Sequence, residues 1–147
     1  MTNVILTVNS GSSAIKFALF PADDPQADAI MRGKIAGIGR QPVVTAIRDG
    51  QPITFAAPLD HIAPDAKHEW LIAELLNRLH EDFADLSPVA VGHRVVHGGL
   101  GHDKPALIDD ALIKELTALE PFAPLHQPHN LAGIRAAQSA FPEAAQV

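Results

Sequence analysis

The feature that most limits the possible folds is a pair of short apolar runs near the amino terminus, joined by a loop of small polar residues. The runs are Val4 to Val8 and Ile15 to Phe20, and the loop reads Asn9-Ser-Gly-Ser-Ser-Ala14. In the second run the large apolar side chains occupy every second position, which is typical of a strand with one buried face. The sequence therefore predicts two strands joined by a tight turn.

The rest of the chain alternates between extended and helical patterns. The expected elements, in chain order, are a strand at 32–38, a helix capped by Asp65 and ending near Asp85, a buried strand at 89–97, a helix from Ile108 to Leu119, a helix starting at Pro128, and the beginning of a strand at 144–147. Strands followed by alternating helices and strands predict an α/β fold with a mixed sheet.

Residues 41–58 are predicted to form an inserted β-hairpin. Two extended segments, 43–47 and 53–57, flank Asp49-Gly50, a dipeptide that type I′ hairpin turns favour. With no repeat and no long polar linker, we expect residues 1–147 to form one domain that carries this hairpin.

Composition narrows the function classes. The 147 residues are 47% hydrophobic, enough for one domain with a core, and carry a net charge of −6, which argues against a nucleic-acid partner. The absence of cysteine excludes disulfides, thiolate metal sites and a cysteine nucleophile. The first apolar run is too short for a signal sequence or a membrane span, so we expect a cytoplasmic protein with no membrane partner.

The loop after the first strand is a candidate phosphate site. Residues 9–13 are small, and they offer backbone N–H groups and hydroxyls that suit phosphate oxygens. Lys16 follows in an otherwise apolar strand, where an unpaired charge is costly to bury. The alternatives are a plain serine-rich turn and an outward-facing surface lysine.

A second candidate group lies on the strand that ends at His97. Arg94 and Val96 are expected on one face of this strand, where a guanidinium can bind a carboxylate or phosphate through two bonds and a valine can border a short alkyl group. His126, just before the third helix, can donate a ring N–H to an anion at the helix's amino end. The alternative for Arg94 is pairing with a core acid, with the histidines satisfied by hydrogen bonds. The alternative for His126 is a ring that caps the helix or faces solvent.

The eight histidines give only a weak indication of a metal site. None forms the two-histidine helical zinc motif with an intervening acid. His126 and His129 are three residues apart beside a proline, and no zinc site is predicted there. His129 is expected on the surface of a first helical turn, and nothing near His68 in the sequence suggests a role for it.

Three segments together resemble the acetate kinase family, which contains the acetate and propionate kinases of the sugar kinase, heat-shock protein and actin superfamily. The segments are Val8 to Lys16, Gly92 to Gly99 and Ala123 to Asn130, in the family's order and at about its spacing. The resemblance implies a mixed sheet of the actin-like ATPase, or ribonuclease H-like, type. It covers only the amino-terminal part of the family's chains, which implies an incomplete domain truncated after the third helix.

The resemblance implies a phosphotransferase that moves the γ-phosphate of ATP to acetate, reversibly, giving acetyl phosphate and ADP with Mg²⁺ as cofactor. It also implies a homodimer. By the same likeness, Asn9 would hold the metal, Ser12 and Lys16 would bind ATP phosphates, Arg94 would bind the carboxylate, Val96 would border the methyl group, and His126 with Arg94 would act in catalysis.

Two other functions stay open. A propionate or butyrate kinase is one, because a methylene in an apolar pocket changes preference by only ~1–3 kcal/mol. A non-catalytic anion-binding or interaction module is the other. In the family, the catalytic aspartate and the adenosine pocket lie beyond the position matching Val147, so we expect negligible kinase turnover from this chain alone.

Overall fold

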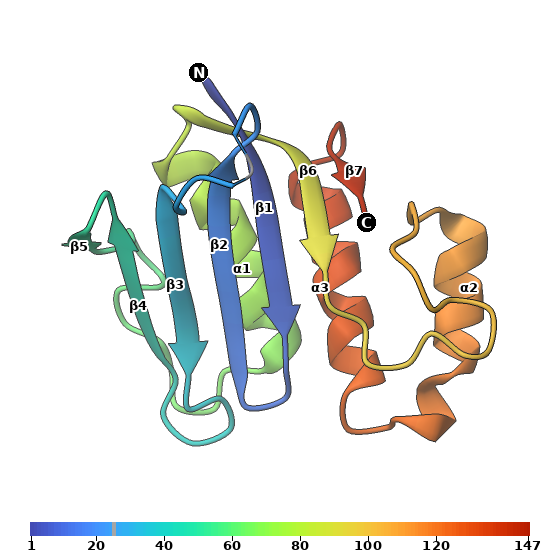
Figure 1. Cartoon of the computed structure of the whole chain (residues 1–147). Coiled ribbons are helices and arrows are strands. Elements are labelled where there is room, and N and C mark those ends of the chain that lie inside the picture. The colour runs from blue at the N-terminus through green and yellow to red at the C-terminus, as the bar shows by residue number, and fades with distance from the viewer. Residues whose placement is uncertain (25) are drawn as a thin grey trace.

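The computed structural model describes residues 1–24 and 26–147. The strands are β1 Thr2–Ser10, β2 Ala14–Pro21, β3 Met31–Ala36, β4 Val43–Arg48, β5 Gln51–Ile53, β6 Leu86–His93 and β7 Ala145–Gln146. They form one seven-stranded sheet in the order β5-β4-β3-β2-β1-β6-β7 (Figure 1). The pairs from β5 to β1 are antiparallel, whereas β6 runs parallel to both β1 and β7. The predicted mixed sheet is therefore confirmed.

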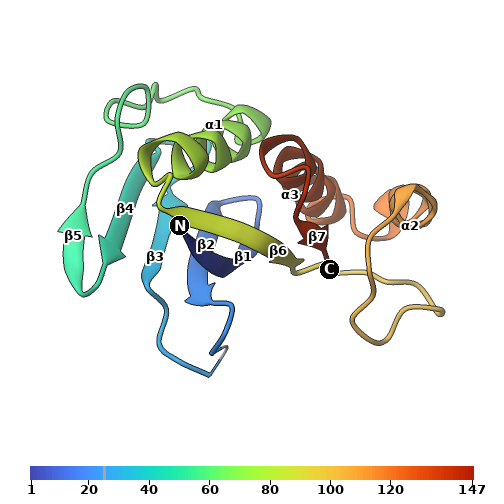
Figure 2. The same cartoon turned by 90° about the horizontal axis from the view of Figure 1, so that it is seen from above.

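Helices cover one face of this sheet. They are α1 His68–Asp82, α2 Asp110–Ala118, the short 3₁₀ helix η1 Glu120–Phe122, and α3 Gln127–Ala140. Figure 2 shows α1 and α3 side by side over the sheet, with α2 beyond α3. Since α1 packs on α3 and α3 packs on β1, the main core lies between these helices and the central strands.

The alternation of side chains in β1 explains why this face is the buried one. Val4, Leu6 and Val8 are buried under the helices, whereas Thr7 is exposed on the opposite face. A period of two thus separates the strand into a core side and an open side. Lys16 of β2 belongs to the open side, because it pairs with Asn9 across the β1–β2 register and is exposed.

The strand β6 ends earlier than the sequence pattern predicted. It ends at His93 rather than at residue 97. The last backbone contact with β1 is the bond from Arg94 N to the Val8 oxygen, at 3.3 Å. Beyond it, the N–H of Val96 donates to a side chain, Asn130 Oδ1, at 2.9 Å. Arg94 and Val96 therefore lie in a loop, and the predicted placement of both on one face of a strand is wrong.

Other element boundaries also differ. The helix α1 starts at His68, and its N-cap residue Lys67 makes no side-chain capping bond, so the expected cap at Asp65 is wrong. The strand β5 is earlier and shorter than the predicted segment 53–57. The turn before it has positive φ at Asp49 (50°) and Gly50 (77°), as a type I′ turn requires. The strand expected near the carboxyl end is confirmed as β7, which lies at the sheet edge beside β6.

Candidate active site

A cavity of about 330 Å³ lies where the β1–β2 turn, the exit from β6 and the start of α3 meet, at the lower end of the sheet in Figure 1. Its lining residues are Asn9, Gly11, Ser12, Ser13, Ala14, Lys16, Arg94, Val96, His126 and Asn130. All six site residues predicted from the sequence are in this set. The structure thus brings them together from three distant segments, while their individual roles stay predictions.

The β1–β2 turn presents hydroxyls and an ammonium group to this cavity. Gly11 N donates to the Ala14 oxygen at 3.0 Å, which closes the turn and leaves Ser12 and Ser13 exposed at its tip. Lys16 lies directly opposite Asn9 in the antiparallel register. Two strands and one short turn therefore place a carboxamide, hydroxyls and a cation on the same cavity.

Asn130 connects the other two segments of the site. Its side chain is buried, and it donates from Nδ2 to the Ser10 oxygen at 2.9 Å while Oδ1 accepts from Val96 N. One carboxamide on α3 thus connects the end of β1 to the loop that follows β6. Asn130 belongs to one of the three family-like segments, but its role cannot be predicted from the sequence, because its two partners are distant in sequence.

His126 lies at the amino end of α3 and is exposed at the cavity. It is the N-cap residue but makes no side-chain capping bond, so the capping alternative is wrong. Its exposure agrees with the solvent-facing alternative. The next residue, Gln127, is buried and donates from Nε2 to the oxygens of His97 and Leu116 at 2.9 and 3.1 Å. The helix start is thereby held in place, and its dipole favours an anion beside His126.

The site is rich in cations without acidic partners. Within residues 1–24 and 26–147, no carboxylate lies within ion-pair distance of Lys16 or Arg94, and none lines the cavity. Lys16 also faces Lys34 across the β2–β3 register, where like charges repel. The alternative of an arginine paired with a core acid is therefore wrong. An anionic ligand would relieve this unbalanced positive charge.

A second, larger hollow of about 760 Å³ shares Asn9, Lys16 and Arg94 with this cavity. It extends along the open face of the sheet past Thr7 and Ala18 toward the apolar residues Ala106 and Ile108. The three segments with the predicted chemistry meet in the smaller cavity, so we take the smaller one as the candidate site.

The oxygen atoms that line the cavity decide whether the site suits Mg²⁺. It offers neutral oxygens, from the Asn9 carboxamide and from the hydroxyls of Ser12 and Ser13, and the described lining contains no carboxylate. Mg²⁺ is usually held by one or two carboxylates together with substrate phosphates. These residues therefore fit a Mg²⁺ that arrives on a nucleotide, with Asn9 as a candidate ligand.

Two histidines outside the cavity differ from their sequence expectations. His68 is buried, and its Nε2 lies 3.1 Å from the Ser10 hydroxyl. His129 is partly buried and packs against it, with ring centroids 4.2 Å apart. The prediction that His129 is a surface residue is wrong, because α1 and α3 pack together at their amino ends.

Comparison with known proteins identifies relatives along nearly the whole chain. The model of the acetokinase family matches residues 4–147. An acetate kinase of Nitrobacter hamburgensis is 38% identical over 151 aligned positions, and a propionate kinase of Escherichia coli O157:H7 is 35% identical over 144. These alignments include 97% and 98% of this chain but 35% and 33% of the two relatives.

Solved structures give the same result. A propionate kinase from Francisella tularensis has a TM-score of 0.77 at 31% identity, over 98% of this chain and 35% of its own. Acetate kinase from Entamoeba histolytica has a TM-score of 0.75 at 28% identity, over 97% of this chain and 33% of its own. The chain thus spans about a third of the length of these relatives.

In the part of the chain that the structure describes, no helix combines the length and apolar character needed to cross a membrane. The family match covers residues 4–147, and the structural likeness confirms the predicted fold class. The chain belongs to the acetokinase family.

Proposed function

We propose that this chain provides the acetate- and phosphate-binding part of a kinase that transfers the γ-phosphate of ATP to acetate. The products are acetyl phosphate and ADP, and the reaction is reversible. The observation that supports this most directly is that Arg94, Lys16 and His126 line one cavity of about 330 Å³. Membership of the acetokinase family supports the carboxylate kinase class.

In this proposal Arg94 orients the acceptor. Its planar guanidinium binds both oxygens of the acetate carboxylate, which fixes the attacking oxygen. Val96 lines the same cavity and borders the methyl group. Both residues lie in the loop held by Asn130, so the acceptor is positioned relative to the β1–β2 turn.

The remaining groups stabilise charge during transfer. A carboxylate oxygen forms a bond to the γ-phosphorus as the bond from phosphorus to the ADP oxygen breaks, and negative charge spreads over the three equatorial oxygens. Lys16 and the Ser12 hydroxyl contact phosphate oxygens, and His126 donates a ring N–H to the group in transfer. Placing such donors in advance accounts for much of the catalysis in reactions of this type. Mg²⁺, bound to ATP, supplies further charge neutralisation when present.

Acetate is proposed as the acceptor, with propionate as the second candidate. The relative at 38% identity is an acetate kinase, whereas the Escherichia coli and Francisella tularensis relatives are propionate kinases. Val96 forms one border of the alkyl site, and one extra methylene changes preference by only ~1–3 kcal/mol.

A chimeric enzyme tests this function. Residues 1–147 replace the aligned first third of the Nitrobacter hamburgensis acetate kinase, and hydroxylamine traps acetyl phosphate as acetohydroxamate. We expect hydroxamate formation that requires ATP, Mg²⁺ and acetate. Arg94→Gln should lower kcat/KM for acetate by about 100-fold or more, because a charged donor to the reacting group is lost.

Arg40→Gln is the matched control, because Arg40 is exposed and does not line the cavity. It should leave kcat/KM unchanged. A folded chimera that binds ATP and acetyl phosphate without forming hydroxamate would favour the anion-binding module instead. Equal activity of the Arg94 variant and the parent would also contradict the proposal. Assays with propionate and butyrate rank the acceptors.

A further inference from the structure

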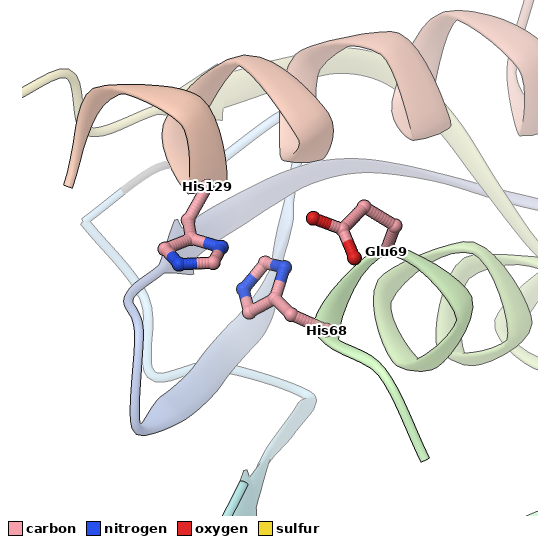
Figure 3. Close-up of side chains that lie close together, drawn as sticks. All are labelled: His68, Glu69 and His129. Atoms are coloured by element: carbon pink, nitrogen blue, oxygen red, sulfur yellow. The ribbon is translucent and has the colours of Figure 1, made fainter. Parts of the chain in front are cut away.

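A second cluster of chemically active side chains lies apart from the cavity, between the amino ends of α1 and α3. His68 and Glu69 open α1, and His129 lies in the first turn of α3. Figure 3 shows the two rings and the carboxylate turned toward one another. One ring nitrogen of each histidine and one carboxylate oxygen all lie within 4.8 Å of each other. None of the three residues lines the cavity.

The two imidazoles leave buried nitrogens without a partner. His68 is 5% exposed, and only its Nε2 is hydrogen-bonded, to the Ser10 hydroxyl. The Nδ1 atoms of His68 and His129 are both buried, and neither has a hydrogen-bond partner among the described residues. A buried polar atom without a hydrogen-bond partner destabilises the fold. A ligand that accepts two nitrogen lone pairs would remove this cost.

The surroundings favour the neutral form of the His68 ring. Burial lowers the pKa of His68, and the neighbouring His129 lowers it further, although Glu69 and the Gly11 backbone act in the opposite direction. If the Ser10 hydroxyl accepts a hydrogen bond from Nε2–H, the lone pair of the neutral His68 ring is on Nδ1. A neutral imidazole whose second nitrogen is held by a hydrogen bond is the usual form of a metal-binding histidine.

We propose that His68, Glu69 and His129 bind one divalent transition-metal ion, with Zn²⁺ the best match. The ligands are Nδ1 of each histidine and one oxygen of Glu69, and a water molecule completes a tetrahedron. Two imidazoles with one carboxylate form a known zinc set, whereas Mg²⁺ and Ca²⁺ prefer oxygen ligands alone.

The three ligand atoms would have to move only slightly closer together to bind one zinc ion. Zinc bonds of about 2.0–2.2 Å place tetrahedral ligand atoms roughly 3.3–3.6 Å apart. The 4.8 Å limit found here is therefore wider than this by roughly 1.5 Å at most. Glu69 is exposed, so its side chain can rotate inward, while His68 is already held by Ser10.

A bound ion would link three parts of the fold. It joins the starts of α1 and α3 directly, and it reaches the end of β1 through the bond between His68 and Ser10. The residue next to His129 is Asn130, which holds the same strand end and the Val96 loop. The ion would thus stabilise the fold beside the cavity and would not bind the ligand of the cavity.

Zinc titration of the metal-free chain tests the site. A competing chromophoric chelator reports Zn²⁺ affinity and stoichiometry, and Co²⁺ absorption reports coordination number. We expect one tight site, with His129→Ala and Glu69→Gln each raising Kd at least 10-fold. His61→Ala, which removes an exposed histidine outside the cluster, should leave Kd unchanged. Circular dichroism checks that each variant is folded.

Histidine ring NMR gives a second readout that does not depend on a variant. On Zn²⁺ addition, the Nδ1 resonances of His68 and His129 should both shift. Equal Kd values for the parent and the His129 variant would overturn the proposal, and so would His68 and His129 resonances that do not respond to Zn²⁺. Neither experiment uses kinase activity, so its outcome is independent of the proposed function.

Discussion

At the scale of single residues, a buried carboxamide sets the geometry of the cavity. Asn130 holds the Ser10 oxygen and the Val96 N–H together. Asn130→Ala should lower the free energy of unfolding by about 1–3 kcal/mol, because the buried Ser10 oxygen and the partly buried Val96 N–H lose their partner. Urea unfolding measures this. Asn77→Ala, on the exposed side of α1, should change stability by no more than about 0.5 kcal/mol. Equal effects of the two variants would contradict this role.

His93 makes stability depend on pH. Burial lowers its pKa below the ordinary value of 6.5, although its hydrogen bond to Gln146 acts in the opposite direction. The unfolded chain therefore binds a proton at a higher pH than the folded chain. Stability is full above the unfolded pKa of about 6.5 and is lost as pH falls from there toward the lower folded value.

His93→Gln should consequently make the unfolding free energy less dependent on pH between about 7.5 and 5.5. Some dependence remains, because burial also lowers the pKa of His68. Urea unfolding across this pH range is the measurement, with His61→Gln as an exposed control that keeps the parental slope. An unchanged slope for the His93 variant would show that this ring titrates normally in the folded chain.

At the scale of elements, the spacing of apolar residues predicted those strands and helices that bury one face. Alternating apolar side chains in β2 and helically spaced ones in α1 and α3 identified these elements, because burial on one face governs both periods. The end of β6 could not be predicted. It depends on where β1 stops offering backbone partners and on Asn130, which is far away in sequence.

The packing of α3 on β1 depends on one glycine. A Cβ at Gly133 would lie 2.9 Å from the Ser10 Cβ, which is fixed by the strand backbone. Gly133→Ala should therefore destabilise the fold, because overpacking costs about 1–3 kcal/mol and exceeds the ~1 kcal/mol gain in helix propensity. Thermal unfolding checks this. Gly101→Ala, with no heavy atom within 4 Å, should be neutral. A stabilised Gly133 variant would refute the close contact.

At the scale of the whole molecule, the predicted site residues meet because three strand or helix ends lie at one end of the sheet. Their residue types and order were visible in the sequence. The contact between His68 and His129 could not be predicted from the sequence, because it arises from the packing of α1 on α3. Neither helix alone contains a recognisable metal motif.

The chain alone should show no kinase turnover above background. Arg94, Ser12 and His126 are exposed, and the described lining offers Mg²⁺ only neutral oxygens and no carboxylate to fix its position. Phosphoryl transfer needs a site closed to water and a positioned metal. The hydroxylamine assay, with the chimera as positive control, measures this. Turnover by the chain that Arg94→Gln abolishes would refute the prediction.

The central claim is that Arg94, Lys16 and His126 share one anion. The most direct test is an NMR titration of the chain with acetyl phosphate that follows the side-chain resonances of these three residues. We expect all three to shift along one saturation curve with a single Kd. Three different curves, or a response from only one of the side chains, would contradict it.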